Sequence, residues 1–240
     1  MEKNERKQSV RVQTSILNGV EKKVLVWLAE RMPRWVTSDM LTALGTIGAI
    51  IVALGCLLSN LDIKWMWLTC FGFFVNWFGD SLDGSLARVR KTQRPLYGFF
   101  LDHNVDGINE VFMICGFGLS PFVHLVSVMA VMILYLLLSM YVYINAHLKN
   151  EFKLTYSGLG PTEFRIIAVI LCIVMMYVPF MTGFSYHIDF MHNSFDATPL
   201  DFAAWIILLI LTVLYASSLI RDGIEYARID PLPKYEDDAK

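Results

Sequence analysis

Residues 80–88 read Asp-Ser-Leu-Asp-Gly-Ser-Leu-Ala-Arg and, after nine further residues, residues 98–106 read Gly-Phe-Phe-Leu-Asp-His-Asn-Val-Asp. This stretch carries four aspartates in two pairs, at 80 and 83 and at 102 and 106. Because residues three or four apart share one face of a helix, each pair forms an acidic stripe. Two stripes that face each other form a cage of carboxylates, so the pattern predicts a pair of facing helices with a polar centre.

The chain around that stretch is strongly apolar. Hydrophobic residues make up 55% of its 240 residues, and the mean hydropathy is +0.50, well above the soluble average. Several apolar runs approach the roughly 20 residues that a helix needs to cross a bilayer. We therefore predict an all-α polytopic membrane protein. Carboxylates at membrane depth are costly unless paired, hydrated or bound to a cation, so the acidic stretch indicates a divalent-metal site, a proton path or an ion path.

The net charge and the cysteines give little evidence for a nucleic-acid partner or for a disulfide. The net charge of −2 argues neither for nor against nucleic acid, and no nucleic-acid partner is expected. The cysteines fall inside apolar runs without metal-ligand spacing, which favours small buried side chains over a disulfide. They are Cys56, Cys70, Cys115 and Cys172.

We expect six transmembrane helices in one membrane domain, residues 37–222. The predicted spans are residues 40–61, 65–83, 96–119, 121–148, 162–184 and 200–219. Residues 15–36 mix apolar and charged side chains at a helical period, which predicts an amphipathic helix lying in the membrane interface. Residues 1–14 are expected to be a flexible tail, and residues 223–240 form a second tail to which no structure is assigned.

The basic residues predict the orientation of these spans. When the connections alternate between the two sides, Lys64 lies alone on one side and the other basic residues lie opposite. The positive-inside rule makes that second side cytoplasmic, with both termini and the aspartates there. The opposite connection, residues 185–198, is acidic and contains histidines. We expect a solvated loop, with a weak surface metal site as the alternative.

The acidic stretch resembles the signature of the CDP-alcohol phosphotransferase family, D-x2-D-G-x2-A-R-x(8 or 9)-G-x3-D-x3-D, with every fixed position occupied. The resemblance implies a membrane enzyme that transfers a substituted phosphate from a CDP-alcohol to a hydroxyl and releases CMP. All four aspartates are candidate ligands of Mg²⁺ or Mn²⁺, two ions per site, with Asp80, Asp83 and Asp102 foremost. Asp102 and Asp106 are the catalytic candidates, and the resemblance implies that Asp106 is the base that takes the acceptor's proton.

Other motif positions are candidates for nucleotide binding. Glycines cost helix stability, so Gly84 and Gly98 indicate close approach of a ligand or of another helix. Here the motif favours the nucleotide, with Ala87 beneath cytidine and Arg88 on a phosphate or a carboxylate. Thr42 lies where the family often has an Asn-x-Leu-Thr segment, although a helix-capping role is equally compatible with that segment. The complete nucleotide set is Asp80, Asp83, Gly84, Ala87, Arg88, Gly98 and Thr42.

The sequence says less about which acceptor and which donor the protein uses than about the chemistry of the motif. Glu163 and Arg165 lie at the predicted depth of the aspartates and are candidates for the acceptor pocket, with helix-entry chemistry and positive-inside charge as alternatives. His103 is a third acceptor candidate. CDP-diacylglycerol is the expected donor. The alternative, which the Asp102-His103 pair resembles, uses CDP-ethanolamine or CDP-choline with diacylglycerol as acceptor.

Two other classes of function compete with the enzyme. A cation or proton transporter would use the intramembrane acids as its path, but they lie on one side of the membrane and no inverted repeat is visible. A non-catalytic scaffold of the same fold would be expected to have lost an aspartate, and none is missing. A homodimer is implied by the family resemblance alone.

Overall fold

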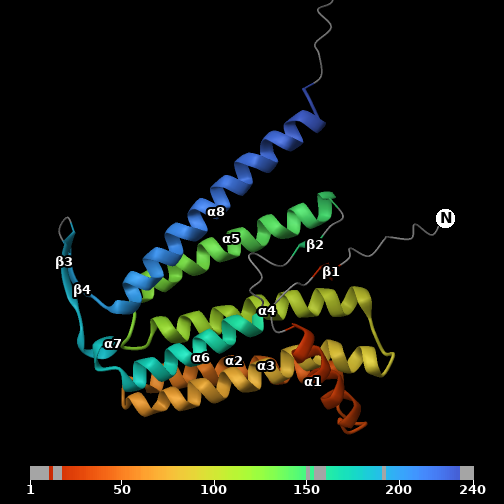
Figure 1. The fold of residues 1–240 in the computed structure, drawn as a ribbon, viewed down its shortest axis with the longest axis horizontal. Coiled ribbons are helices and arrows are strands. Elements are labelled where there is room, and N and C mark those ends of the chain that lie inside the picture. Colours follow the sequence, from red (N-terminus) through yellow and green to blue (C-terminus); the bar gives the residue numbers. More distant parts are fainter. Residues whose placement is uncertain (1–10, 13–17, 150–151, 154–160, 191–192, 233–240) are drawn as a thin grey trace, which may run out of the picture.

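The structure, a computed structural model, describes residues 11–12, 18–149, 152–153, 161–190 and 193–232 (Figure 1). The helices are α1 (Asn18–Arg31), α2 (Ser38–Leu58), the 3₁₀ helix η1 (Ile63–Trp65), α3 (Met66–Val89), α4 (Pro95–Gly118), α5 (Leu125–Lys149), α6 (Pro161–Tyr177), α7 (Pro179–Gly183) and α8 (Pro199–Ile229). The strands are β1 (Arg11–Val12), β2 (Phe152–Lys153), β3 (Tyr186–Phe190) and β4 (Asn193–Ala197). Apart from residues 11–12, the predicted tail 1–14 lies outside the described residues, as do residues 233–240 of the second tail.

α2 and α3 pack closely against each other. A Cβ added to Gly48 of α2 would overlap the backbone of Asn76, and one added to Gly79 of α3 would overlap the backbone of Gly45. The absence of side chains at these positions lets the two backbones approach. Asn76 then donates from Nδ2 to the carbonyl oxygen of Gly45 at 2.9 Å, which satisfies a buried amide inside the interface.

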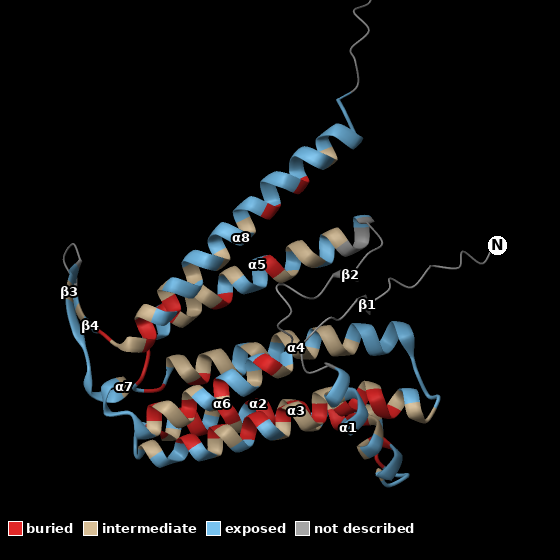
Figure 2. Ribbon diagram, viewed as in Figure 1, coloured by how far each residue is buried: buried red, intermediate tan, exposed pale blue. Residues whose placement is uncertain are grey.

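The other helices are added around this pair (Figure 1). α4 packs on α2 and α6 on α3, while α5 packs on α4 and α8 packs on α5. One apolar cluster joins α2, α3 and α6, with Val52, Phe73 and Cys172 among its buried members. A second cluster joins α1 to the ends of α2 and α3 through Leu25 and Leu82. Burial is concentrated in α2 and α3, whereas most of α8 is exposed (Figure 2).

The fold is that of a mostly helical membrane protein. Three helices among the described residues are long and apolar enough to cross a bilayer, namely α2, the segment 125–145 of α5, and α8. Only 11% of the apolar window of α8 is buried against protein, as expected for a helix that faces lipid. α3, α4 and α6 overlap the other three predicted spans. The six-span count and the interfacial position of α1 stay predictions.

Several predicted boundaries differ from the structure. α3 runs to Val89, past the predicted end at residue 83, since no proline interrupts it. The fifth predicted span ends early at Tyr177, because Pro179 disfavours a helical conformation at Val178 and starts the short α7. α8 continues to Ile229, so the first part of the tail assigned no structure is helical.

The predicted loop 185–198 is instead an antiparallel hairpin, in which β3 pairs with β4. Its charged side chains pair with each other: His187 Nδ1 lies 2.9 Å from Asp196 Oδ1, and His187 Nε2 lies 3.4 Å from Asp189 Oδ1. His187 and Asp196 lie directly opposite each other on the two strands, and cross-strand pairs of this kind stabilise a hairpin. Within the described residues, the cluster of three or more candidate metal ligands lies elsewhere, on α3 and α4.

Candidate active site

Asp80 of α3 and Asp102 and Asp106 of α4 form a compact carboxylate cluster. Each contributes one oxygen, and these oxygens all lie within 4.8 Å of one another. The two acidic stripes therefore face each other as the spacing predicts. Several partly buried carboxylate oxygens at this separation match the all-oxygen coordination of hard divalent cations, so the donor set fits Mg²⁺ or Mn²⁺.

Asp83 lies beside this cluster and accepts hydrogen bonds from two residues of α2. The Thr42 hydroxyl donates to Asp83 Oδ2 at 2.6 Å, and the Ser38 hydroxyl donates to the Asp83 carbonyl oxygen at 3.0 Å. The backbone N–H of Gly84 donates to Asp83 Oδ1. Asp83 is 9% exposed, so its carboxylate is held in a fixed direction by α2 and by its own helix. Its role as a metal ligand stays a prediction.

Arg165 of α6 reaches the aspartates. Its Nη2 donates to Asp80 Oδ2 at 2.5 Å and its Nε donates to Asn76 Oδ1 at 2.9 Å. The guanidinium thus joins three helices, because Asn76 also bonds α2 through Gly45. Glu163, predicted beside Arg165, is 7% exposed in the first turn of α6. The first turn of α6 is anchored separately: the Thr162 hydroxyl donates to Glu21 Oε1 of α1 at 2.6 Å.

The motif glycines face open space, unlike those of the α2–α3 interface. A Cβ on Gly98 would meet nothing within 4 Å, and one on Gly84 would meet only the guanidinium of Arg88, at 3.5 Å. Arg88 is exposed and donates to the Ser85 hydroxyl at 2.9 Å, while Ala87 is partly buried. Among the described residues, no other helix comes within 4 Å of a Cβ built at either of these two glycines. Their assignment to the nucleotide stays a prediction.

His103 faces α5 and its own preceding turn. Its Nδ1 lies 2.9 Å from the carbonyl oxygen of Phe99 and 3.7 Å from Asp102 Oδ2. Its ring lies 4.1 Å from the Phe99 ring and 5.5 Å from that of Tyr143 on α5, between centroids. His103 therefore borders the carboxylate cluster on the α5 side, whereas Arg165 borders it on the α6 side.

The sequence reasoning missed a fifth acid at this site. Glu110 lies one turn beyond Asp106 on α4, and the Tyr135 hydroxyl of α5 donates to Glu110 Oε1 at 2.9 Å. The sequence contains a pattern that could have indicated Glu110, because Asp102, Asp106 and Glu110 follow one another at four-residue steps on one helix face. The family signature ends at Asp106 and does not include the next turn.

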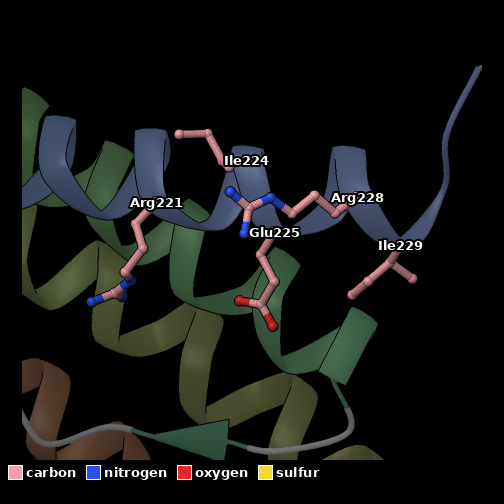
Figure 3. A pocket seen from close by; sticks show the side chains of 5 residues that line it. All are labelled: Arg221, Ile224, Glu225, Arg228 and Ile229. Atoms are coloured by element: carbon pink, nitrogen blue, oxygen red, sulfur yellow. The ribbon is translucent and has the colours of Figure 1, made fainter.

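Two further polar regions lie outside the motif. Asp201 of α8 is fully buried and accepts hydrogen bonds from the His124 backbone at 3.0 Å and from the Ser127 hydroxyl at 2.7 Å, which fixes the starts of α5 and α8. A groove at the other end of α8 is lined from that one helix alone (Figure 3). Its residues are Arg221, Ile224, Glu225, Arg228 and Ile229, none of them a predicted site residue.

Comparison with known proteins finds a matching family and several similar proteins. A family model described as CDP-alcohol phosphatidyltransferase matches residues 35–216. Phosphatidylinositol phosphate synthase of Cutibacterium acnes is 34% identical over 84 residues, which are 35% of this chain and 38% of that protein. Cholinephosphotransferase 1 of Xenopus laevis is 31% identical over 96 residues, 38% of this chain and 24% of that protein. Human cholinephosphotransferase 1 is 29% identical over the same length. The similarity thus spans well under half the length of each of these curated relatives.

Proposed function

The chain belongs to the CDP-alcohol phosphatidyltransferase family, and on that premise we propose that it transfers a substituted phosphate from a CDP-alcohol to the hydroxyl of an acceptor alcohol, releasing CMP. One observation carries the proposal: three motif carboxylates from two helices have oxygens within 4.8 Å of one another. This is the arrangement that phosphoryl-group transfer needs, because charge accumulates on the phosphate oxygens in the transition state.

The family uses divalent metal ions, and the carboxylate cluster can bind one. Asp80, Asp102 and Asp106 would hold Mg²⁺ or Mn²⁺, with Asp83 adjoining them, and we propose two ions per site. The bound ions supply charge neutralisation at the pyrophosphate and at the leaving CMP. We assign proton removal from the acceptor hydroxyl to a carboxylate oxygen of Asp106.

The reaction is a direct displacement. A bond forms between the acceptor oxygen and the β-phosphorus of the donor, while the bond from that phosphorus to the CMP oxygen breaks. The acceptor proton goes to Asp106 and the electron pair leaves with CMP. No covalent intermediate with the protein is required.

Nucleotide binding is assigned to the open face at Gly84, Ala87 and Gly98. Arg88 is exposed beside it and can pair with a phosphate. Thr42 contributes through Asp83, which its hydroxyl holds at 2.6 Å. We place Arg165 at the phosphates or at the acceptor, because its guanidinium already lies at Asp80.

We propose CDP-diacylglycerol as the donor and a small alcohol as the acceptor. The competing assignment uses CDP-ethanolamine or CDP-choline with diacylglycerol. Similarity does not separate them, since the synthase and the cholinephosphotransferase relatives are 34% and 31% identical over similar lengths. We also propose a six-span topology in which the site and both termini are cytoplasmic. In this proposal α1 lies in the membrane interface and the protein forms a homodimer.

The decisive experiment measures CMP release by the purified protein in mixed micelles. CDP-diacylglycerol is offered with Mg²⁺ or Mn²⁺ and a pool of alcohols: serine, inositol, inositol phosphate and glycerol phosphate. We expect acceptor-dependent CMP that chelation with EDTA and Asp106→Asn both abolish. If this donor yields no CMP, CDP-ethanolamine and CDP-choline with diacylglycerol are tested next. Absence of CMP from every pair contradicts the enzyme and favours ion transport through the same acids.

A further inference from the structure

One carboxylate oxygen on α1 connects α3 to the start of α6. Glu21 lies in the first turn of α1. Its Oε1 accepts a hydrogen bond from the indole Nε1 of Trp77 on α3 at 2.9 Å and another from the Thr162 hydroxyl on α6 at 2.6 Å. Hydrogen bonds to a carboxylate are shorter and stronger than those between neutral groups. Because both bonds end on one oxygen, they hold the two helices at a fixed separation beside α1.

This bridge lies next to the contacts of Arg165. On α6, Thr162 precedes Arg165 by three residues, so the two share one helix face. Trp77 belongs to the same turn of α3 as Asn76 and Asp80. Both of these accept hydrogen bonds from the guanidinium. A shift of the first turn of α6 would therefore break the bridge and also move Arg165 away from Asp80.

The apolar packing of α6 is concentrated further along the helix. Its buried apolar residues are Ala168, Cys172 and Met175. In the first two turns, by contrast, the side chains of Phe164 and Ile167 are 68% and 53% exposed. Polar contacts therefore do much to hold the start of α6 against α3, and the loss of one of them should affect where the guanidinium lies.

α1 gives Glu21 a firm support. Leu25 and Ala29 follow it at four-residue steps and are 7% and 2% exposed. They belong to the apolar cluster that joins α1 to Leu82 and Leu86 of α3. Residues four apart share one helix face, so the face that carries Glu21 is the face that packs on the bundle. The carboxylate is therefore presented by a helix that is itself fixed to α3.

We propose that Glu21 is a positioning residue, which holds the start of α6 against α3 so that the Arg165 guanidinium stays at Asp80. The inference rests on the proposed phosphotransfer, in which Arg165 serves the phosphates or the acceptor. Glu21 is not one of the clustered carboxylates, and it precedes the motif in the sequence. Its effect on the reaction is exerted through Arg165 and not through contact with a substrate.

The first test measures CMP release by variants of the full chain in mixed micelles, with the donor and alcohol pool that support the reaction of the wild type. Glu21→Ala removes the shared acceptor, whereas Glu21→Gln keeps an oxygen that can accept both bonds. Glu30→Ala is the matched control, because it removes an exposed carboxylate from the same helix. We expect kcat/KM to fall about tenfold in Glu21→Ala, and to stay within about threefold of wild type in Glu21→Gln and about twofold in Glu30→Ala.

A double-mutant cycle separates positioning from a general structural role. Arg165→Gln cannot form the ion pair with Asp80, so in this background the bridge no longer has a guanidinium to place. The loss caused by Glu21→Ala should then shrink from about tenfold to about twofold or less. A structural role would give the same fold-loss in both backgrounds, since independent effects add in free energy.

Backbone hydrogen exchange provides a measurement that needs no residual activity in Arg165→Gln. We expect peptides that cover the first turns of α6 to exchange faster in Glu21→Ala than in wild type, because local opening becomes easier when the bridge is lost. Peptides from α2 should exchange at the wild-type rate. Glu30→Ala should match wild type in both regions.

Three results would overturn the assignment. They are a kcat/KM of Glu21→Ala within about twofold of wild type, an equal loss in the wild-type and Arg165→Gln backgrounds, and unchanged exchange at the start of α6 in Glu21→Ala. Failure of the proposed function is distinct, because wild type would then release no CMP from any donor and acceptor pair.

Discussion

The α2–α3 interface and the motif face of α3 and α4 both rely on glycine, and they use it in opposite ways. In the interface, a Cβ on Gly48 or Gly79 would overlap the backbone of the facing helix. On the motif face, a Cβ on Gly98 would meet nothing within 4 Å, and one on Gly84 would meet only a flexible arginine. Gly79 and Gly84 lie on the same helix, five residues apart. The role of a membrane glycine is therefore set by the atoms opposite it.

The two regions are also mechanically connected. A Cβ on Gly45 would lie 3.3 Å from the backbone nitrogen of Asp80, so the tight interface extends to the base of the carboxylate cluster. Asn76 links the two, since it bonds Gly45 on one side and Arg165 on the other. The packed region fixes the backbone of Asp80, and the open region leaves room in front of its side chain. Variants in each region should accordingly affect different measurements.

The largest effect is expected from Asp102→Asn, in the open region. Removal of one charge from the cluster weakens cation binding and should lower kcat/KM for CMP release by about a thousandfold. The unfolding temperature should move by no more than about 3 °C, because Asp102 is partly exposed and not part of either apolar core. Thermal unfolding in detergent checks the second point. A variant that loses activity only because it unfolds would contradict the separation of the two regions.

Gly48→Ala should give the opposite result. Its new methyl group would overlap the Asn76 backbone, and overpacking of this kind costs about 1–3 kcal/mol or more. We expect a clear drop in the unfolding temperature and in the yield of monodisperse protein. Gly223→Ala is the matched control, because a Cβ there meets nothing within 4 Å and alanine favours the helix. Equal stability of the two variants would mean that α2 and α3 do not pack this closely.

Gly98→Ala tests the open motif face of α4. The new methyl group meets nothing within 4 Å among the described residues, so stability should be unchanged or slightly higher. If the nucleotide occupies this open face, the methyl group should raise KM for the CDP-alcohol about tenfold, a cost of about 1.4 kcal/mol. Steady-state CMP release at varied donor concentration measures it. An unchanged KM would remove Gly98 from the nucleotide site and leave its openness unexplained.

The sequence was informative where the chemistry depends on local spacing. The three-residue and four-residue steps of the motif predicted that Asp80, Asp102 and Asp106 face a common centre, and their oxygens lie within 4.8 Å. The helix pattern placed the helix starts within a few residues, whereas several helix ends differed: α3 and α8 run further than predicted, and Pro179 ends the fifth predicted span early. These features are set by neighbours along the chain.

Pairings between distant segments could not be read from the sequence in the same way. Gly48 opposite Asn76 and Tyr135 opposite Glu110 depend on which helices meet, and in what rotation. No local period encodes that choice. Asp201 is a similar case, because its bonds to His124 and Ser127 join segments more than 70 residues apart.

The smallest expected effect tests the boundary between the two regions. Thr42 belongs to α2, the packed helix, but its hydroxyl donates to Asp83 of the motif at 2.6 Å. Thr42→Val keeps the shape and removes the donor, which costs about 1–3 kcal/mol when a charged buried group loses its partner. We expect kcat/KM to fall several-fold to about tenfold, and Thr42→Ser, which restores the hydroxyl, to recover most of it. If Thr42→Ser fails equally, the residue acts through packing alone. If Thr42→Val retains full activity, Asp83 needs no support from α2 and the carboxylate cluster is positioned by α3 and α4 without it.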